Sequence, residues 1–287
     1  MNEVLIEGIK SEYGLDKIRL VQSKRGVHVY YVERDNNSYY LKSFDHESDA
    51  LEINCYKVLS EHKLPIIKCY KSTAKSVLLE DITSSNQYRL GCQDDFLNHK
   101  VAKSVAVWFR QLHNIRKVEE FFSFLPEERI IFDREDLNKC LNYYKKDFFT
   151  QLICEIDTLN DYLESRPLKL IHDDFYYKNF FVNKVSHETI MFDFNFMKRG
   201  LVSQDLSLIR RNLSSASNDS EKAFIESYGD FDPLEYDVYE LYRNLSCLLD
   251  GLAYKENPEW VDKALFKLNN NILLESLKLI MNTLREV

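Results

Sequence analysis

The spacing of apolar residues in this chain changes from mainly strand-like to mainly helical near residue 82, and this change limits the fold more than any other feature of the sequence. Before it, the runs GVHVYYV and SYYLKSF are rich in β-branched and aromatic residues. They flank the segment ERDNNS, a pattern typical of two β-strands joined by a turn. In the second run Tyr40, Lys42 and Phe44 share one face by alternation. The first ~82 residues are therefore expected to be rich in strand.

The same N-terminal part carries one helical pattern and a further strand. The segment SDALEINCYKVLSEHK predicts a helix with Ser48 as its N-cap, and Pro65 follows the end of this helix. The segment KSVLLEDI predicts a short buried strand that ends in acidic residues.

Beyond residue 82 the pattern is mainly helical. In VAKSVAVWFRQLHNI, apolar residues recur at i, i+4, i+8 and i+11, the spacing of a helix face that packs on a core. Two short strands, FFVN and TIMFDF, are expected around the turn KVSHE, and helices again from residue 204 onward, interrupted at Pro233 and Pro258. The sequence predicts an α+β protein with a small strand-rich lobe over 1–82 and a larger, mainly helical lobe over 83–287.

Composition narrows the class of protein. The chain has 18 Tyr and 18 Phe but only 7 Gly and 5 Pro, so most of it should be regular structure. A formal net charge of −8 argues against a nucleic-acid or membrane-surface binder and suits a cationic small molecule. The 6 cysteines form no C-x-x-C pair, and no apolar run approaches the ~20 residues of a membrane span. We expect a cytoplasmic protein with reduced thiols, and composition leaves its oligomeric state open.

The segment LIHDDFYYKNFFVN, residues 170–183, places charged residues between two apolar runs. Charge beside a core is costly unless it is paired or binds a ligand. The segment fits the pattern H-x-D-x-x-x-x-N through His172, Asp174 and Asn179, and Asp193 follows at the end of an apolar strand. Protein-kinase-like enzymes arrange phosphoryl-transfer groups in this order, with a base and two oxygen ligands for Mg²⁺.

With these motifs the chain resembles the aminoglycoside phosphotransferase and choline-kinase-like branch of the protein-kinase-like superfamily. The aromatic-rich loop is most similar to that of bacterial spore-coat-type members. In this branch the loop typically reads H-G-D-x-x-x-x-N, and an apolar strand ending in I-D-F-[DE] follows. The similarity covers roughly residues 15–215, and its further points of agreement are Leu112, His113, Gly200, Asp205 and Leu206.

The resemblance implies a two-lobed kinase-like fold with a small antiparallel sheet in the N-terminal lobe. It also implies roles for individual residues. Asp174 matches the catalytic base, and Asn179 and Asp193 match the Mg²⁺ ligands. Lys42 matches the strand lysine that contacts the α- and β-phosphates, and Glu52 matches the helix glutamate that pairs with it.

The nucleotide, ATP or GTP, is expected to bind in the N-terminal lobe. By the same resemblance, the backbone of Glu80 and Ile82 would contact the base, and the loop SKRGVH with Gly26 would cover the phosphates. That loop has one glycine where kinases have several, so side chains such as Ser23 or Lys24 could supply the cover.

Two residues differ from the family pattern, and two alternatives to the expected function remain open. Asp173 replaces the usual glycine, and it either makes a structural hydrogen bond or helps to hold a cationic acceptor; Asn195 replaces an acid often found at its position. The expected function is phosphorylation of a hydroxyl on a small molecule, such as an aminoglycoside-like or other cationic acceptor. The alternatives are a catalytically inactive, nucleotide-binding relative and a metal-dependent phosphohydrolase built on His172 and Asp173.

Overall fold

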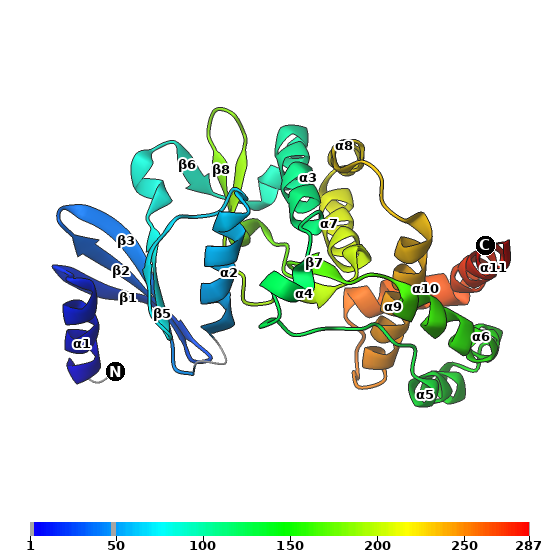
Figure 1. Ribbon diagram of the computed structural model, residues 1–287. Helices are drawn as coiled ribbons and strands as arrows, with labels where there is room; N and C mark the ends of the chain where they lie inside the picture. Colours follow the sequence, from blue (N-terminus) through cyan, green and yellow to red (C-terminus); the bar gives the residue numbers. More distant parts are fainter. Residues whose placement is uncertain (1–2, 47–49, 287) are drawn as a thin grey trace. The chain divides into compact units, whose positions relative to one another are not determined.

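The computed structural model describes residues 3–46 and 50–286 (Figure 1). Its antiparallel sheet and its many helices confirm the predicted α+β class. The predicted boundary after residue 82 lies inside the first of two compact units and stays a prediction. The first unit comprises Met1–Pro126, Leu170–Arg199 and Leu208–Gly229, and the second comprises Glu127–Lys169, Gly200–Ser207 and Asp230–Val287.

A five-stranded antiparallel sheet dominates the N-terminal part of the first unit, in the order β1-β2-β3-β5-β4. Helix α1 (Glu3–Tyr13) packs on one face of the sheet, where Tyr13, Tyr30 and Leu41 are buried (Figure 1). The sequence analysis did not single out α1 or β1, and β1 is exposed along nearly its whole length. The strands are β1 (Lys17–Lys24), β2 (Val27–Arg34), β3 (Asn37–Phe44), β4 (Cys69–Ser72) and β5 (Ser76–Glu80).

Two tight turns connect the first three strands. Arg25 and Gly26 have φ of 51° and 76°, and Asp35 and Asn36 have φ of 51° and 60°. Two successive residues of positive φ are characteristic of the type I′ turn, whose twist matches that of the flanking strands. The segment ERDNNS therefore contributes only two residues to its turn, because the strands extend further into it than the sequence analysis expected.

Helix α2 (Leu51–Glu61) follows β3, and its buried apolar residues include Ile53, Cys55 and Leu59. The helix begins after Ala50, which makes no capping hydrogen bond through its side chain. The expected N-cap, Ser48, lies outside the described residues. Glu52 and Tyr56 lie on the buried side of the helix together with its apolar residues.

A second small sheet has the order β6-β8-β9, and its strand β8 begins directly after Asn179, the last residue of the H-x-D-x-x-x-x-N motif. The predicted hairpin of FFVN and TIMFDF forms, but its second strand stops at Met191, and Asp193 adopts a φ of 65°. The elements of this region are η2 (Ile82–Ser85), β6 (Tyr88–Leu90), η3 (Gln93–Leu97), α3 (His99–His113), α4 (Val118–Phe121), β7 (Lys169–Ile171), η4 (Tyr177–Asn179), β8 (Phe180–Asn183), β9 (Thr189–Met191) and β10 (Lys198–Gly200).

The second unit is helical and has its own apolar core, which includes Phe149, Leu152 and Val238. Pro233 is the first residue of α9 and Pro258 is the N-cap of α10, so both interrupt the helical pattern where the sequence predicted. None of the helices in the described ranges has the length and apolarity needed to cross a membrane. The remaining helices of the chain are α5 (Arg134–Tyr144), α6 (Asp147–Ser165), α7 (Val202–Ala216), α8 (Asn218–Tyr228), α9 (Pro233–Gly251), α10 (Glu259–Asn269) and α11 (Ile272–Glu286).

Candidate active site

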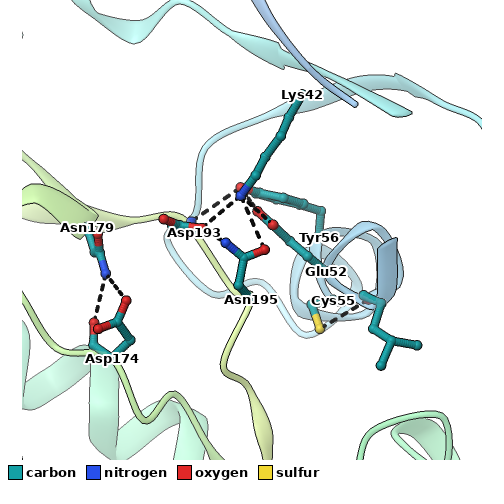
Figure 2. A network of polar contacts seen from close by, with 9 residues as sticks. Lys42, Glu52, Cys55, Tyr56, Asp174, Asn179, Asp193 and Asn195 are labelled. Carbon is teal, nitrogen blue, oxygen red and sulfur yellow. Dashed lines mark hydrogen bonds and ion pairs between the residues drawn. The ribbon is translucent and has the colours of Figure 1, made fainter. Parts of the chain in front are cut away.

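Lys42 lies in the middle of the large sheet and points at two carboxylates. Strand β3 holds its backbone between Val29 of β2 and Val77 of β5. Its Nζ donates to Glu52 Oε2 at 2.5 Å and to Asp193 Oδ1 at 2.8 Å (Figure 2). Lys42 is therefore the residue at which the sheet, α2 and the segment after β9 meet.

The lysine–glutamate pair is buried. Glu52 is 1% exposed and Lys42 is 8% exposed. Burial raises the pKa of the Glu52 carboxyl, against the opposing effect of Lys42. Burial by itself would lower the pKa of Lys42, but the carboxylates of Glu52 and Asp193 raise it above its usual value. Lys42 thus keeps its positive charge at neutral pH.

Tyr56 is a member of this network that the sequence analysis missed. Its hydroxyl donates to Glu52 Oε1 at 3.0 Å and accepts from the backbone N–H of Asp193 at 3.3 Å. Burial raises the pKa of Tyr56, so the phenol stays protonated and can donate. The sequence offered one signal for Tyr56. It lies four residues after Glu52 in a predicted helix, and residues four apart are neighbours on one helix face.

Asp174 and Asn179 form the second cluster. The amide Nδ2 of Asn179 donates to the Asp174 carboxylate at 2.7 Å and to its backbone carbonyl at 2.9 Å (Figure 2). The backbone N–H of Asp174 donates to His172 Nδ1 at 3.3 Å. The five-residue spacing of the motif thus closes a loop in which one amide orients one carboxylate.

The hairpin of β8 and β9 connects this loop to Asp193. The N–H of Phe192 donates to the carbonyl of Asn179 at 3.1 Å. The residue before Asp193 is therefore hydrogen-bonded to the backbone of Asn179. In Figure 2 Asp193 lies between the Asp174–Asn179 pair and the Lys42–Glu52 pair. Asn195 donates to Asp193 Oδ1 at 2.5 Å and accepts from Lys42 at 3.3 Å, which an acid at this position could not do in the same way.

His172 is buried and supports the loop, because its Nδ1 accepts from the backbone N–H of Asp174. Its ring lies 5.9 Å from that of Trp108, 6.1 Å from that of Phe109 and 5.6 Å from that of Phe194. A phosphohydrolase centre would need further ligands beside it, but the described residues contain no group of three or more His, Cys, Asp or Glu able to hold a metal ion. The His172–Asp173 alternative therefore has no structural support among them.

Asp173 forms an ion pair with a lysine that follows Asp193 in the chain. Its Oδ2 lies 2.6 Å from Nζ of Lys198, the first residue of β10. This contact is compatible with a structural role for Asp173, and both roles considered for it stay predictions.

The match to a known family agrees with this geometry. Residues 17–242, well over half of the chain, match the family model described as the phosphotransferase enzyme family. The chain belongs to this family. The match confirms the predicted membership and the predicted enzyme class, whereas the similarity to spore-coat-type members stays a prediction. A search of curated proteins found no match.

Solved structures of other phosphotransferases share the fold of this family member. An ethanolamine kinase of Plasmodium vivax is 14% identical, with a TM-score of 0.59, and the match covers 96% of this chain and 89% of that one. A choline kinase of Streptococcus pneumoniae is 14% identical, with a TM-score of 0.57 and 98% of both chains covered. A spectinomycin phosphotransferase, solved with ADP and spectinomycin, is 18% identical, with a TM-score of 0.58, and the match covers 96% of this chain and 98% of that one.

The remaining predicted residues of this phosphotransferase lie along the large sheet. Gly26 is the second residue of the β1–β2 turn, and its carbonyl accepts from the backbone N–H of Asp45 at 2.9 Å. Glu80 ends β5 and donates its N–H to the carbonyl of Lys68 at 2.9 Å, so only its carbonyl remains to contact a base. Ile82 begins η2, where the first N–H groups have no partner within the helix.

The strand register places Ser23 and Lys24, the two side chains considered for covering the phosphates, on opposite faces of the large sheet. Lys24 pairs with Val27, which pairs with Phe44, and cross-strand partners share a face. Phe44 and Lys42 are two residues apart in β3, so Lys24 lies on the face of Lys42. Ser23, the neighbour of Lys24 in the strand, faces the opposite side.

Gly91 is a second feature that the sequence analysis missed. A Cβ at this position would lie 2.2 Å from the backbone oxygen of Tyr177 and 2.8 Å from the ring of Phe180. Its N–H donates to the carbonyl of Phe180 at 2.9 Å. The segment after β6 thus packs against the turn that carries Asn179, at a distance that only glycine allows.

Proposed function

We propose that this phosphotransferase transfers the terminal phosphoryl group of ATP to a hydroxyl group of a small molecule in a Mg²⁺-dependent reaction. The observation that carries the proposal is Lys42 held between Glu52 and Asp193, with the Asp174–Asn179 pair at the same open end of the β8–β9 hairpin as Asp193. A positioned cation, a positioned base and a separate carboxylate are the groups that phosphoryl transfer requires.

Each polar group has a role that follows from its contacts. Lys42 would bind the phosphates of the nucleotide, and Glu52 would keep its ammonium group in place. Asp174 would accept a hydrogen bond from the acceptor hydroxyl and take its proton during the transfer. Asn179 would hold the Asp174 carboxylate in the orientation that this step needs, because it donates to it at 2.7 Å.

Asn179 and Asp193 would hold the metal ion, and their donor atoms fit Mg²⁺. Asn179 donates through Nδ2, so its side-chain carbonyl oxygen can still bind a metal ion. Asp193 accepts hydrogen bonds from Lys42 and Asn195 through Oδ1, so its Oδ2 can do the same. Mg²⁺ prefers such oxygen ligands and is commonly bound by one or two carboxylates together with substrate phosphates. When bound, the ion would neutralise negative charge on the phosphates.

The donor nucleotide is proposed to be ATP. Among the solved structures of similar fold, a spectinomycin phosphotransferase was solved with ADP and also with AMP, which supports an adenine nucleotide over the GTP that the sequence left open. The carbonyl of Glu80 and the N–H of Ile82 would bind the base, and the turn at Gly26 would lie over the phosphates with Lys24 on the same face.

The acceptor is proposed to be an alcohol that carries a positive charge. The net charge of −8 favours cationic ligands, and proteins of similar fold are named for ethanolamine, choline and spectinomycin.

Two measurements on the purified chain test the proposal. Thermal unfolding with ATP or GTP, each with and without Mg²⁺, should show a rise in melting temperature with Mg²⁺ and ATP, because a ligand that binds only the folded state stabilises it. ADP release should then be assayed with choline, ethanolamine, spectinomycin and a macrolide, with EDTA as the control that abolishes turnover. Stabilisation by ATP without turnover of any acceptor would favour the inactive relative, and no stabilisation by either nucleotide would refute the proposal.

A further inference from the structure

Asp81 lies between Glu80 and Ile82, the two residues whose backbone groups are proposed to bind the base. It is itself buried, with an exposed fraction of 8%. Its Oδ2 accepts from the hydroxyl of Ser38 at 2.8 Å, and its Oδ1 accepts from the hydroxyl of Thr83 at 2.6 Å. Both oxygens of this carboxylate are therefore bound by hydroxyl groups from within the chain.

These contacts differ from those that an aspartate usually makes at the start of a helix. Asp81 is the N-cap of η2, a position where an aspartate side chain commonly accepts from a backbone N–H of the first turn. It makes no such hydrogen bond. Its backbone carbonyl accepts from the N–H of Ser84 at 3.2 Å and from the hydroxyl of Ser84 at 2.7 Å. The main chain and the side chain of Asp81 are thus held separately, and the side chain ties this segment to β3 rather than capping η2.

The bond to Ser38 holds this segment on the face of the large sheet that carries Lys42. Ser38, Tyr40 and Lys42 alternate along β3, so their side chains share one face. Burial raises the pKa of Tyr40, and the Asp81 carboxylate raises it further, which places Asp81 beside this row of side chains. Four residues of strand separate Ser38 from Lys42 by about 13 Å. An ATP molecule bound to Lys42 through its phosphates is long enough to reach this segment with its base.

The direction of one carbonyl group decides which base can bind there. The N–H of Glu80 donates to the carbonyl of Lys68 at 2.9 Å, which leaves the Glu80 carbonyl as the acceptor for a base. The amino group of adenine can donate to it, whereas guanine carries an oxygen at the corresponding position. Such a hydrogen bond weakens steeply when it is misaligned. The Glu80 carbonyl belongs to the same peptide group as the N–H of Asp81, so the contacts of Asp81 set its direction.

Resting on the proposed function, we propose that Asp81 is a positioning residue for the recognition of adenine, which acts through the peptide group that it shares with Glu80. By accepting hydrogen bonds from Ser38 and Thr83, it holds the Glu80 carbonyl in the direction that the amino group of adenine requires. Asp81 does not itself touch the base.

The test compares the binding of two non-hydrolysable nucleotides, AMP-PNP and GMP-PNP, each with Mg²⁺, by isothermal titration calorimetry on the full chain. Wild type should prefer AMP-PNP. Asp81→Ala should weaken binding of AMP-PNP about tenfold and change binding of GMP-PNP by no more than about twofold, because the preorganised contact that is lost is made only with adenine. Ser38→Ala should give a smaller change of the same kind, and Ser38→Thr, which keeps the hydroxyl, should bind like wild type. Asp94→Ala, the loss of an exposed carboxylate in the same unit, is the matched control.

Two results would overturn the inference. The first is equal binding of AMP-PNP by wild type and Asp81→Ala. The second is an equal loss of affinity for both nucleotides, because Asp81 would then support the fold of this region and not the recognition of the base. If the melting curve of Asp81→Ala shows that it does not fold, the same comparison between wild type and Ser38→Ala decides. A wild-type chain that binds both nucleotides equally well overturns the inference alone, whereas one that binds neither refutes the proposed function and this inference with it.

Discussion

Asn179 holds Asp174 at two points, donating to its carboxylate at 2.7 Å and to its backbone carbonyl at 2.9 Å. A side-chain amide has two N–H donors on one nitrogen, so one residue can fix both the position of a loop and the orientation of a carboxylate within it. Asn179 thus orients Asp174, the expected base. Asp174 is therefore the most informative residue to substitute.

Asp174→Asn should lower turnover by a factor of about 10²–10⁴, because a positioned general base contributes that much to proton transfer. The amide that replaces the carboxylate has nearly the same size, so the affinity for Mg²⁺ and ATP should change by no more than about threefold. Steady-state kinetics with an acceptor found by the ADP-release assay measures both quantities. Asp94→Asn, an exposed change in the same unit, is the control, and normal turnover by Asp174→Asn would remove this residue from the mechanism.

Removal of Lys42 should affect stability as well as activity. Lys42→Met leaves the buried Glu52 without its closest cation, and breaking a buried pair in this way typically costs about 3–5 kcal/mol. Lys42→Met/Glu52→Gln should be less destabilised than Lys42→Met alone, because the stranded charge is removed. Urea denaturation of the two variants and of Glu52→Gln completes a double-mutant cycle. Strict additivity of the free energies of unfolding would show that the two side chains are not coupled.

Gly91→Ala should lower turnover through the catalytic loop. A methyl group 2.2 Å from the backbone oxygen of Tyr177 cannot be accommodated by a rotamer change, so the turn that carries Asn179 must shift. We expect a loss of turnover of about 10²-fold, the effect of a displacement of about 1 Å in a catalytic group. Gly8→Ala is the matched control, because nothing lies within 4 Å of a Cβ at that helical position. Full activity of Gly91→Ala would show that the close packing has no bearing on catalysis.

Asp95 should make part of the stability of this region depend on pH. Burial by itself would raise the pKa of its carboxyl, but the Arg89 guanidinium and the N–H of Cys92 outweigh burial and lower it. The carboxylate therefore stabilises the fold above its unfolded pKa of about 3.9, and this contribution is lost as pH falls through the lower, folded pKa.

Asp95→Asn should accordingly lower the urea midpoint at pH 7, and the difference from wild type should narrow below about pH 4. The exposed neighbour Asp94 provides the control Asp94→Asn, which should leave the midpoint nearly unchanged at both pH values. A difference that is constant from pH 7 to pH 3 would show that the ion pair with Arg89 is not its source.

The residues brought together at the site were largely identifiable from the sequence. Asp174 and Asn179 belong to one short motif, and Asp193 follows after a hairpin whose two strands and turn have clear local signals. Lys42 and Glu52 lie on elements predicted by their own periodicity. Each of these residues is marked by a pattern within a few positions of itself, so a reading along the chain could find it.

Other contacts join pairs of residues far apart in the chain, and no pattern in the sequence predicts them. Tyr56 lies close to Glu52 in sequence, but its bond to the Asp193 backbone spans 137 positions. The approach of Gly91 to Tyr177, and the choice of Lys198 as the partner of Asp173, likewise arise only when separate segments pack together.

By itself, the sequence determined the α+β class, the order of the phosphoryl-transfer groups and the membership of the family, because these depend on local periodicity and on short motifs. Only the tertiary structure decided which charges are paired, which strand face carries Lys24, and where a single methyl group cannot fit. Those properties follow from distances between segments remote in the chain, and such distances are set by packing rather than by any neighbouring residue.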